Sequence, residues 1–165
     1  MSVPDPGGVF ERHHLAVFRF LRRMTGSPSA AEDLTQEVFL RVIRGAERYE
    51  ERAREVSWVF RIARNVLVDL HRAQARAPER VAIQDGGPYP IPAMQTLGIA
   101  LDEALARLPQ EDREAFLMRE VGGLGYADIS EATGATADAV RMRIYRARLA
   151  LRTALGHARR AAEPA

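Results

Sequence analysis

The sequence contains neither cysteine nor lysine. The absence of cysteine excludes disulfides, thiolate metal sites and cysteine nucleophiles, and it fits a reducing compartment. All 24 basic residues are arginine, which coding bias largely explains, although guanidinium also pairs bidentately with phosphate and with guanine edges. Because the formal net charge is only +2, basic charge defines a binding surface only where it clusters on one face.

Long hydrophobic runs are also missing. No apolar run is long enough to cross a bilayer, and the first residues, MSVPDPGGVF, lack the basic stretch and apolar run of a signal peptide. We therefore expect a soluble, cytoplasmic protein without membrane insertion. The hydrophobic fraction of 47% is high enough for a packed core, and 165 residues suit one domain or two small ones.

Catalytic and cofactor motifs are a third absence. The His, Asp and Glu residues show no metal-ligand spacing, and there is no nucleophile motif or glycine-rich phosphate loop. The adjacent His13 and His14 fall on a predicted helix, so they point to different sides. We expect no catalytic residue, no metal and no cofactor, and we do not expect an enzyme.

Helical periodicity dominates what is present, and no convincing alternating strand is visible. The expected helices lie at 9–25, about 28–44, 58–76, 97–107, 111–121, 126–133 and 137–156. Ser29 and Glu32 have the spacing of a capping box for the second helix, and Ser57 is placed to cap the third.

Proline and glycine concentrate in residues 77–96, which predicts a linker. The predicted fold class is all-α, with two small helical domains joined by a flexible linker and a helix-turn-helix in the C-terminal domain. The expected division is 1–76 for the first domain, 77–96 for the linker, 97–156 for the second domain and 157–165 for a tail.

The segment ADAVRMRIYRARLALR, residues 137–152, concentrates arginine on one predicted helix. At about 100° per residue, its apolar stripe consists of Val140, Ile144, Ala147, Leu151 and Leu155. The outward side carries Met142, Tyr145 and Leu149 between arginines, which a merely solvated face rarely does. Gly134 allows a tight turn before this helix, and Thr136 can cap it. A helix, a glycine turn and an arginine-bearing helix favour a helix-turn-helix that enters the DNA major groove over a structural helix pair.

Two further surfaces stand out in the N-terminal part. Asp33, Gln36, Leu40 and Ile43 share one side of the second helix, opposite a second apolar side; a helix with two apolar-bearing sides suggests a protein partner, or burial on both sides. The helix at 58–76 gathers polar groups opposite its apolar stripe of Val59, Ile62, Ala63, Val66, Leu70 and Ala73. That polar side carries Arg61, Arg64, Asn65, Val68 and Arg72. It is either a solvated face or a nucleic-acid surface. Trp58 fits a core position or a base-stacking platform.

Three segments resemble one known family. They are DLTQEVFLRVIR (33–44), WVFRIARNVLVDLHR (58–72) and ALARLPQEDREAFLMREVGGLGYADISEATGATADAVRMRIYRARLALR (104–152). Their order and spacing resemble the ECF (extracytoplasmic function) group of bacterial RNA polymerase sigma factors, within the sigma-70-type family. That group contains sigma domains 2 and 4 and lacks domain 3.

The resemblance implies partners and site residues. It implies binding to core RNA polymerase, through the β′ clamp helices and the β flap, to promoter DNA and to an anti-sigma factor. The implied clamp-helix contacts are Asp33, Gln36, Glu37 and Leu40. The implied contacts to the melted −10 element are Trp58, Arg61, Arg64 and Asn65, together with loop 48–57. The implied contacts to the −35 element are Thr136, Arg141, Met142, Tyr145 and Arg146.

The predicted function is therefore an alternative sigma factor that recruits core polymerase to particular promoters and initiates transcription there. The alternative is a stand-alone helix-turn-helix regulator that binds duplex DNA. Such a regulator needs neither a helix at 33–44 with two apolar-bearing sides nor the polar side of the 58–76 helix that contains Asn65. A third class, a sigma mimic that binds an anti-sigma factor without touching DNA, does not require Arg141, Arg146 and Asn65.

Overall fold

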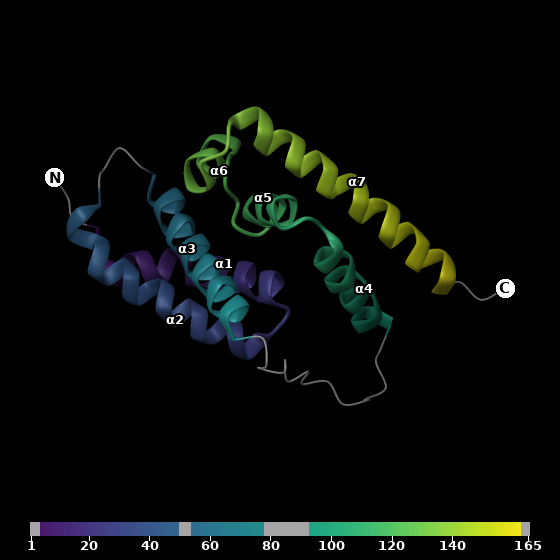
Figure 1. Ribbon diagram of the computed structural model, residues 1–165, viewed down its shortest axis with the longest axis horizontal. Coiled ribbons are helices and arrows are strands. Elements are labelled where there is room, and N and C mark those ends of the chain that lie inside the picture. Colours follow the sequence, from purple (N-terminus) through teal and green to yellow (C-terminus); the bar gives the residue numbers. More distant parts are fainter. Residues whose placement is uncertain (1–3, 50–53, 78–92, 163–165) are drawn as a thin grey trace.

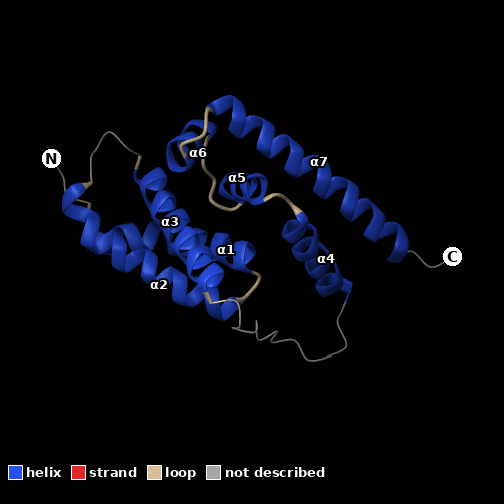
Figure 2. Cartoon of the chain, viewed as in Figure 1, coloured by secondary structure: helices blue, strands red, loops and turns tan. Residues whose placement is uncertain are grey.

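The computed structural model describes residues 4–49, 54–77 and 93–162, and every regular element within these ranges is a helix. Residues 4–77 form a first half with three α-helices (Figure 1). The second half, residues 93–162, contains four, and Figure 2 shows the tan loops that separate them. The all-α fold class with its C-terminal helix-turn-helix is confirmed. Most of the predicted linker and part of loop 48–57 lie outside the described residues.

The first half comprises α1 (Pro6–Thr25), α2 (Pro28–Gly45), the short 3-10 helix η1 (Ala46–Arg48) and α3 (Glu55–Arg76). Gly26 ends α1 with a φ of 71°, a left-handed conformation that glycine adopts without steric cost. The expected capping box at Ser29 is wrong. The N-cap of α2 is Ser27, whose side chain accepts a hydrogen bond from the Ala30 N–H at 3.2 Å, because Pro28 takes the first helical position, which suits it.

The second half comprises α4 (Ala93–Arg107), α5 (Gln110–Glu120), α6 (Tyr126–Thr133) and α7 (Ala137–Ala162). The helix-turn-helix has the predicted form. Gly134 turns with a φ of 75°, and the Thr136 hydroxyl accepts a hydrogen bond from the Ala139 N–H at 3.1 Å. Helix α4 begins earlier than predicted, because Ala93, Met94 and Gln95 are good helix formers. Helix α7 continues six residues beyond 156, because its alanine-rich end sustains a helix and Gly156 costs only about 1 kcal/mol.

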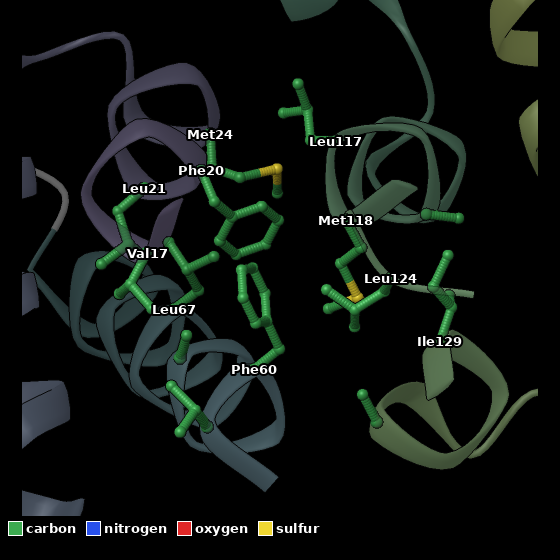
Figure 3. Packing of buried hydrophobic residues seen from close by; sticks show 14 of the residues in the cluster. Val17, Phe20, Leu21, Met24, Phe60, Leu67, Leu117, Met118, Leu124 and Ile129 are labelled. Atoms are coloured by element: carbon green, nitrogen blue, oxygen red, sulfur yellow. The ribbon is translucent and has the colours of Figure 1, made fainter. Parts of the chain in front are cut away.

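The two halves share one hydrophobic core. Helices α1 and α3 of the first half contact α5 and α6 of the second. Figure 3 shows Phe20, Met24 and Phe60 on one side of this contact, facing Leu117, Met118 and Leu124 on the other. We call this contact the interdomain seam. Its residues are at most 5% exposed, so the halves are packed together rather than separate on a tether.

Glycine at position 122 permits the closest approach within the seam. A Cβ atom there would lie 2.8 Å from Phe60 Cζ and 2.7 Å from the Met118 carbonyl oxygen. Side chains essentially never approach a backbone carbonyl so closely, so only glycine lets the end of α5 rest against the Phe60 ring. The ring itself packs edge-on against Phe20, with ring centroids 5.4 Å apart.

Helix α3 is consequently buried on two sides. The expected stripe of Val59, Ala63 and Val66 is buried in the first half. Phe60 and Leu67, which were not assigned to that stripe, are also buried, whereas Ala73 is exposed. The expected stripe is therefore wrong at its C-terminal end. It also omits Phe60, which packs against the second half, and Leu67, which lies beside Val17 and Leu21 of α1 (Figure 3).

Candidate functional site

The side of α2 predicted to dock on a protein is open to solvent. Asp33 and Gln36 are exposed, Leu40 is 47% exposed and Ile43 is 57% exposed. Val38 and Val42 on the other side are fully buried. One apolar side therefore serves the core, and the second remains uncovered in this arrangement, as a binding surface requires.

Glu37 differs from its neighbours on α2, because it belongs to a charge network with α3. Arg41 Nε donates to Glu37 Oε1 at 2.7 Å, and Arg41 Nη1 donates to Asp69 Oδ2 at 2.8 Å. The hydrogen bond with Glu37, followed by that with Asp69, raises the pKa of Arg41. Glu37 therefore contributes to the α2–α3 contact as well as to the exposed side.

The predicted −10 residues on α3 lie at the edge of the interdomain seam. Arg61 Nη2 donates to the Glu131 carbonyl oxygen at 3.1 Å, and Arg64 Nε lies 2.9 Å from Glu114 Oε1. That second pair is an ion pair whose N–H is not aligned on the carboxylate. Asn65 is exposed. Glu131 and Glu114 of the second half thus pair with Arg61 and Arg64, two of the arginines on this side of α3.

Trp58 occupies the packed side rather than an open platform. It is partly buried against the core, and its ring lies 4.8 Å from the Tyr49 ring, centroid to centroid. The structure therefore brings Arg61, Arg64 and Asn65 to one surface and places Trp58 beside the core at the start of α3.

Asp128 joins the two halves, and the sequence interpretation missed it. This aspartate is 5% exposed, and its Oδ1 accepts a hydrogen bond from Ser57 Oγ at 3.1 Å. Its Oδ2 accepts from Arg54 Nη1 and from the Gly125 N–H, both at 3.2 Å. Ser57 is therefore not the cap of α3, which begins two residues earlier. The available signal was the acidic residue in the first turn of α6, which is typical of a helix start.

Glu114 offers a prediction about stability. Burial raises its pKa, and Arg64 only partly offsets that effect. Between the ordinary value of 4.5 and the raised pKa, the folded chain binds more protons than the unfolded chain, so the free energy of unfolding falls as pH rises. Glu114→Gln should remove this slope and raise the thermal midpoint at neutral pH by about 2–4 °C. A lower midpoint at neutral pH, measured by circular dichroism, would show that the pair with Arg64 outweighs burial.

The outward side of α7 has the predicted composition. Met142 is 51% exposed, Tyr145 is 61% exposed and Leu149 is 50% exposed, while Val140 and Ile144 are buried. Arg141 and Arg146, whose side chains are 60% and 54% exposed, lie near this apolar strip. The outward side of α7 therefore presents an apolar and aromatic strip with guanidiniums beside it. Such a surface suits contact with the base edges of the DNA major groove.

The arginines of α7 differ in how firmly they are held. Arg146 forms a bidentate pair with Asp112 of α5, with Nε to Oδ2 at 3.0 Å and Nη2 to Oδ1 at 2.8 Å. The hydrogen bond with Asp112, which is 4% exposed, raises the pKa of Arg146. Arg143 and Arg148 pair with exposed Glu111 and Glu120 at 2.7 and 2.5 Å. Arg146 is therefore a bridge within the second half as well as a candidate DNA contact.

No helix among the described residues has the length and hydrophobicity to span a membrane. Within the same residues, no three His, Asp or Glu side chains gather in a way that could hold a metal ion.

Comparison with protein families gives two matches in series. Residues 9–77 match the family Sigma-70 region 2, and residues 98–151 match the family Sigma-70, region 4. The second match contains the helix-turn-helix, and the first contains the exposed side of α2 and the polar side of α3. The two matched regions correspond to the two halves of the fold.

Curated relatives agree with these matches. The chain is 35% identical over 159 residues to the ECF RNA polymerase sigma factor SigE of Mycolicibacterium smegmatis, spanning 92% of this chain and 62% of that protein. It is 34% identical to the RNA polymerase sigma factor CarQ of Myxococcus xanthus, spanning 90% of this chain and 87% of that one. It is 32% identical to the ECF RNA polymerase sigma factor SigM of Mycobacterium tuberculosis, spanning 90% and 76%.

Two solved structures share the fold. One is the sigma factor RpoE of Bartonella quintana in complex with the anti-sigma factor NepR, with a TM-score of 0.77 and 22% identity, covering 91% of this chain and 96% of that chain. The other is CnrH in complex with the cytosolic domain of CnrY, with a TM-score of 0.72 and 22% identity, covering 92% and 88%.

Proposed function

The chain belongs to the ECF group of the sigma-70 family of RNA polymerase sigma factors, and from that premise we propose that it directs core RNA polymerase to a particular set of promoters. In this role it acts in the cytoplasm, binds polymerase and promoter DNA, and leaves RNA synthesis to polymerase. The single observation that carries the proposal is the combination of three surfaces in one chain: the uncovered side of α2, the polar side of α3 and the arginine-flanked strip of α7.

The uncovered side of α2 is the proposed docking surface for the β′ clamp helices. It combines a carboxylate and an amide with two apolar side chains about half exposed, Leu40 and Ile43. Mixed surfaces of this kind are typical of protein interfaces, in which an apolar centre is bordered by polar groups. The second half, which corresponds to sigma domain 4, would add a second contact, with the β flap.

The polar side of α3 is the proposed surface for the separated −10 strand. Arg61 and Arg64 can hold phosphates, and Asn65 can hydrogen-bond base edges. In the described arrangement Glu131 and Glu114 hold these arginines, so the second half occupies the place of the DNA. Promoter melting by this face therefore requires the two halves to separate.

This arrangement also suits regulation by an anti-sigma factor. A protein that binds both halves while they are packed together stabilises the closed form at the expense of the DNA-binding form. The fold shared with the RpoE chain of the NepR complex supports this part of the proposal. An anti-sigma factor is thus the proposed regulatory partner.

Run-off transcription tests the function as a whole. The purified chain is added to core RNA polymerase with a library of genomic promoter fragments. We expect transcripts that start downstream of a small set of sequences and that require both core polymerase and this chain. Duplex binding without core polymerase, together with no promoter-specific transcripts in its presence, would instead identify a stand-alone helix-turn-helix regulator.

The docking surface gives a separate prediction. Replacing Asp33 and Gln36 by Ala should weaken binding to core polymerase by about tenfold or more. The thermal midpoint should remain nearly unchanged, because exposed substitutions cost little stability. Glu11→Ala, an exposed acidic change on α1 and outside this side of α2, is the matched control and should bind normally. Unchanged affinity of the double variant in a fluorescence titration would contradict the docking assignment.

A further inference from the structure

Tyr126 lies at the point where three helices of the second half meet. It is the first residue of α6 and packs, partly buried, against the core. The guanidinium carbon of Arg119, from α5, lies 4.9 Å from the centre of its ring, and that of Arg141, from α7, lies 5.6 Å from it. Guanidinium groups at these distances from an aromatic ring are held by cation–π attraction.

The two arginines are held differently on their other sides. Arg119 Nη1 donates to the Leu124 carbonyl oxygen at 2.9 Å, which fixes it to the turn before α6. Arg141 Nη1 donates to Asp138 Oδ1 at 3.0 Å, but Asp138 is 91% exposed. Ion pairs in such open positions hold a side chain weakly. Among the described residues that contact Arg141 in this way, the Tyr126 ring is therefore the anchor that is itself fixed by packing.

We propose that Tyr126 is a positioning residue that orients the Arg141 guanidinium for contact with the −35 element. The inference rests on the proposed function and adds a residue to it. Arg141 is 60% exposed beside Met142, in the N-terminal part of α7, the part of a recognition helix that contacts base edges. Orienting a long side chain before binding removes part of the entropy lost on binding. Tyr126 acts on DNA recognition through Arg141.

The test uses holoenzyme assembled from core polymerase and the full chain, with a promoter found by run-off transcription. Affinity is measured on the matched −35 sequence and on a mutated one, and their ratio is the specificity. Tyr126→Leu, which removes the ring, should lower this ratio about 3–10-fold. Tyr126→Phe keeps the ring and should retain the ratio. Tyr126→Met is a second ringless variant of similar length, to be used where Tyr126→Leu lowers the thermal midpoint.

The double variant of Tyr126→Leu and Arg141→Ala distinguishes the positioning role of Tyr126 from a merely structural one. If Tyr126 acts through Arg141, adding Tyr126→Leu to Arg141→Ala should not lower the specificity ratio further. Additive losses in the double variant, or equal losses of affinity on both promoters, would overturn the inference.

Failure of the inference and failure of the proposed function give different results. A wild-type holoenzyme with no preference between matched and mutated −35 sequences would overturn both. A preference that Arg141→Ala lowers, and that Tyr126→Leu and Tyr126→Met leave intact, would overturn the positioning role alone.

Discussion

Leu117→Glu is expected to separate the two halves while leaving each of them helical. Leu117 is 2% exposed and lies in the interdomain seam, on the side that faces Phe20 and Met24 (Figure 3). An unpaired carboxylate enclosed there would destabilise the closed form by roughly 3–5 kcal/mol. Opening of the seam returns the carboxylate to water, so the open form should dominate. Small-angle X-ray scattering should show a larger radius of gyration, with helical circular dichroism retained.

Leu15→Glu is the matched control, because Leu15 of α1 is 50% exposed and lies outside the seam. It should leave the radius of gyration unchanged. The Leu117 variant should also bind single-stranded −10 DNA more tightly than the wild type, since Arg61 and Arg64 are released from Glu131 and Glu114. An unchanged radius of gyration with a lower thermal midpoint would mean that Leu117 serves only the core of the second half.

Arg146→Ala should cost both folding stability and promoter binding, whereas Arg141→Ala should cost promoter binding alone. The difference follows from their partners. Arg146 is the bidentate partner of Asp112, a buried carboxylate that the substitution would leave uncompensated. Asp138, the carboxylate that pairs with Arg141, is 91% exposed, so no buried charge is left uncompensated. A fall of about 5 °C or more in the thermal midpoint is expected for Arg146→Ala, against little change for Arg141→Ala.

The double variant Arg146→Ala with Asp112→Asn separates stability from DNA contact. Removing the buried charge should restore much of the thermal midpoint. Promoter binding should stay weak if Arg146 also contacts DNA, and it should recover if Arg146 serves only as a bridge. A normal midpoint for Arg146→Ala alone would contradict the assigned importance of the pair with Asp112.

Local sequence patterns predicted the order of the helices and the helix-turn-helix, although α1, α3 and α4 begin earlier than predicted and α7 ends later. Gly134 and Thr136 act within a few residues of themselves, as a turn and as a cap, so their roles follow from local chemistry. The outward strip of Met142, Tyr145 and Leu149 followed from helical periodicity for the same reason. The wrong prediction of a capping box at Ser29 also concerned local chemistry. Two serines flank Pro28, and Ser27 is the N-cap because proline prefers the first helical position.

The interdomain seam could not be predicted in this way. It joins Phe60 to residues near 118–124, across a segment whose pattern indicates a linker. Periodicity shows that a helix has apolar residues on a second side, as α3 does at Phe60 and Leu67, but it does not show what covers them. The buried acids Glu114 and Asp128 find their partners across this seam, and Asp112 finds Arg146 through the packing of α5 against α7. All three contacts join residues far apart in the sequence, so these roles were missed.

The shared core also sets the ratio of closed molecules, in which the two halves are packed together, to open molecules, in which they are separate. This ratio determines how tightly any partner that needs the open form appears to bind. A ligand that binds only open molecules has an apparent Kd equal to its intrinsic Kd divided by the open fraction. With about one molecule in a hundred open, promoter or polymerase binding that needs the open form would weaken about 100-fold. The fit between Gly122 and the Phe60 ring would then adjust the threshold for transcription, although neither residue belongs to the three proposed binding surfaces.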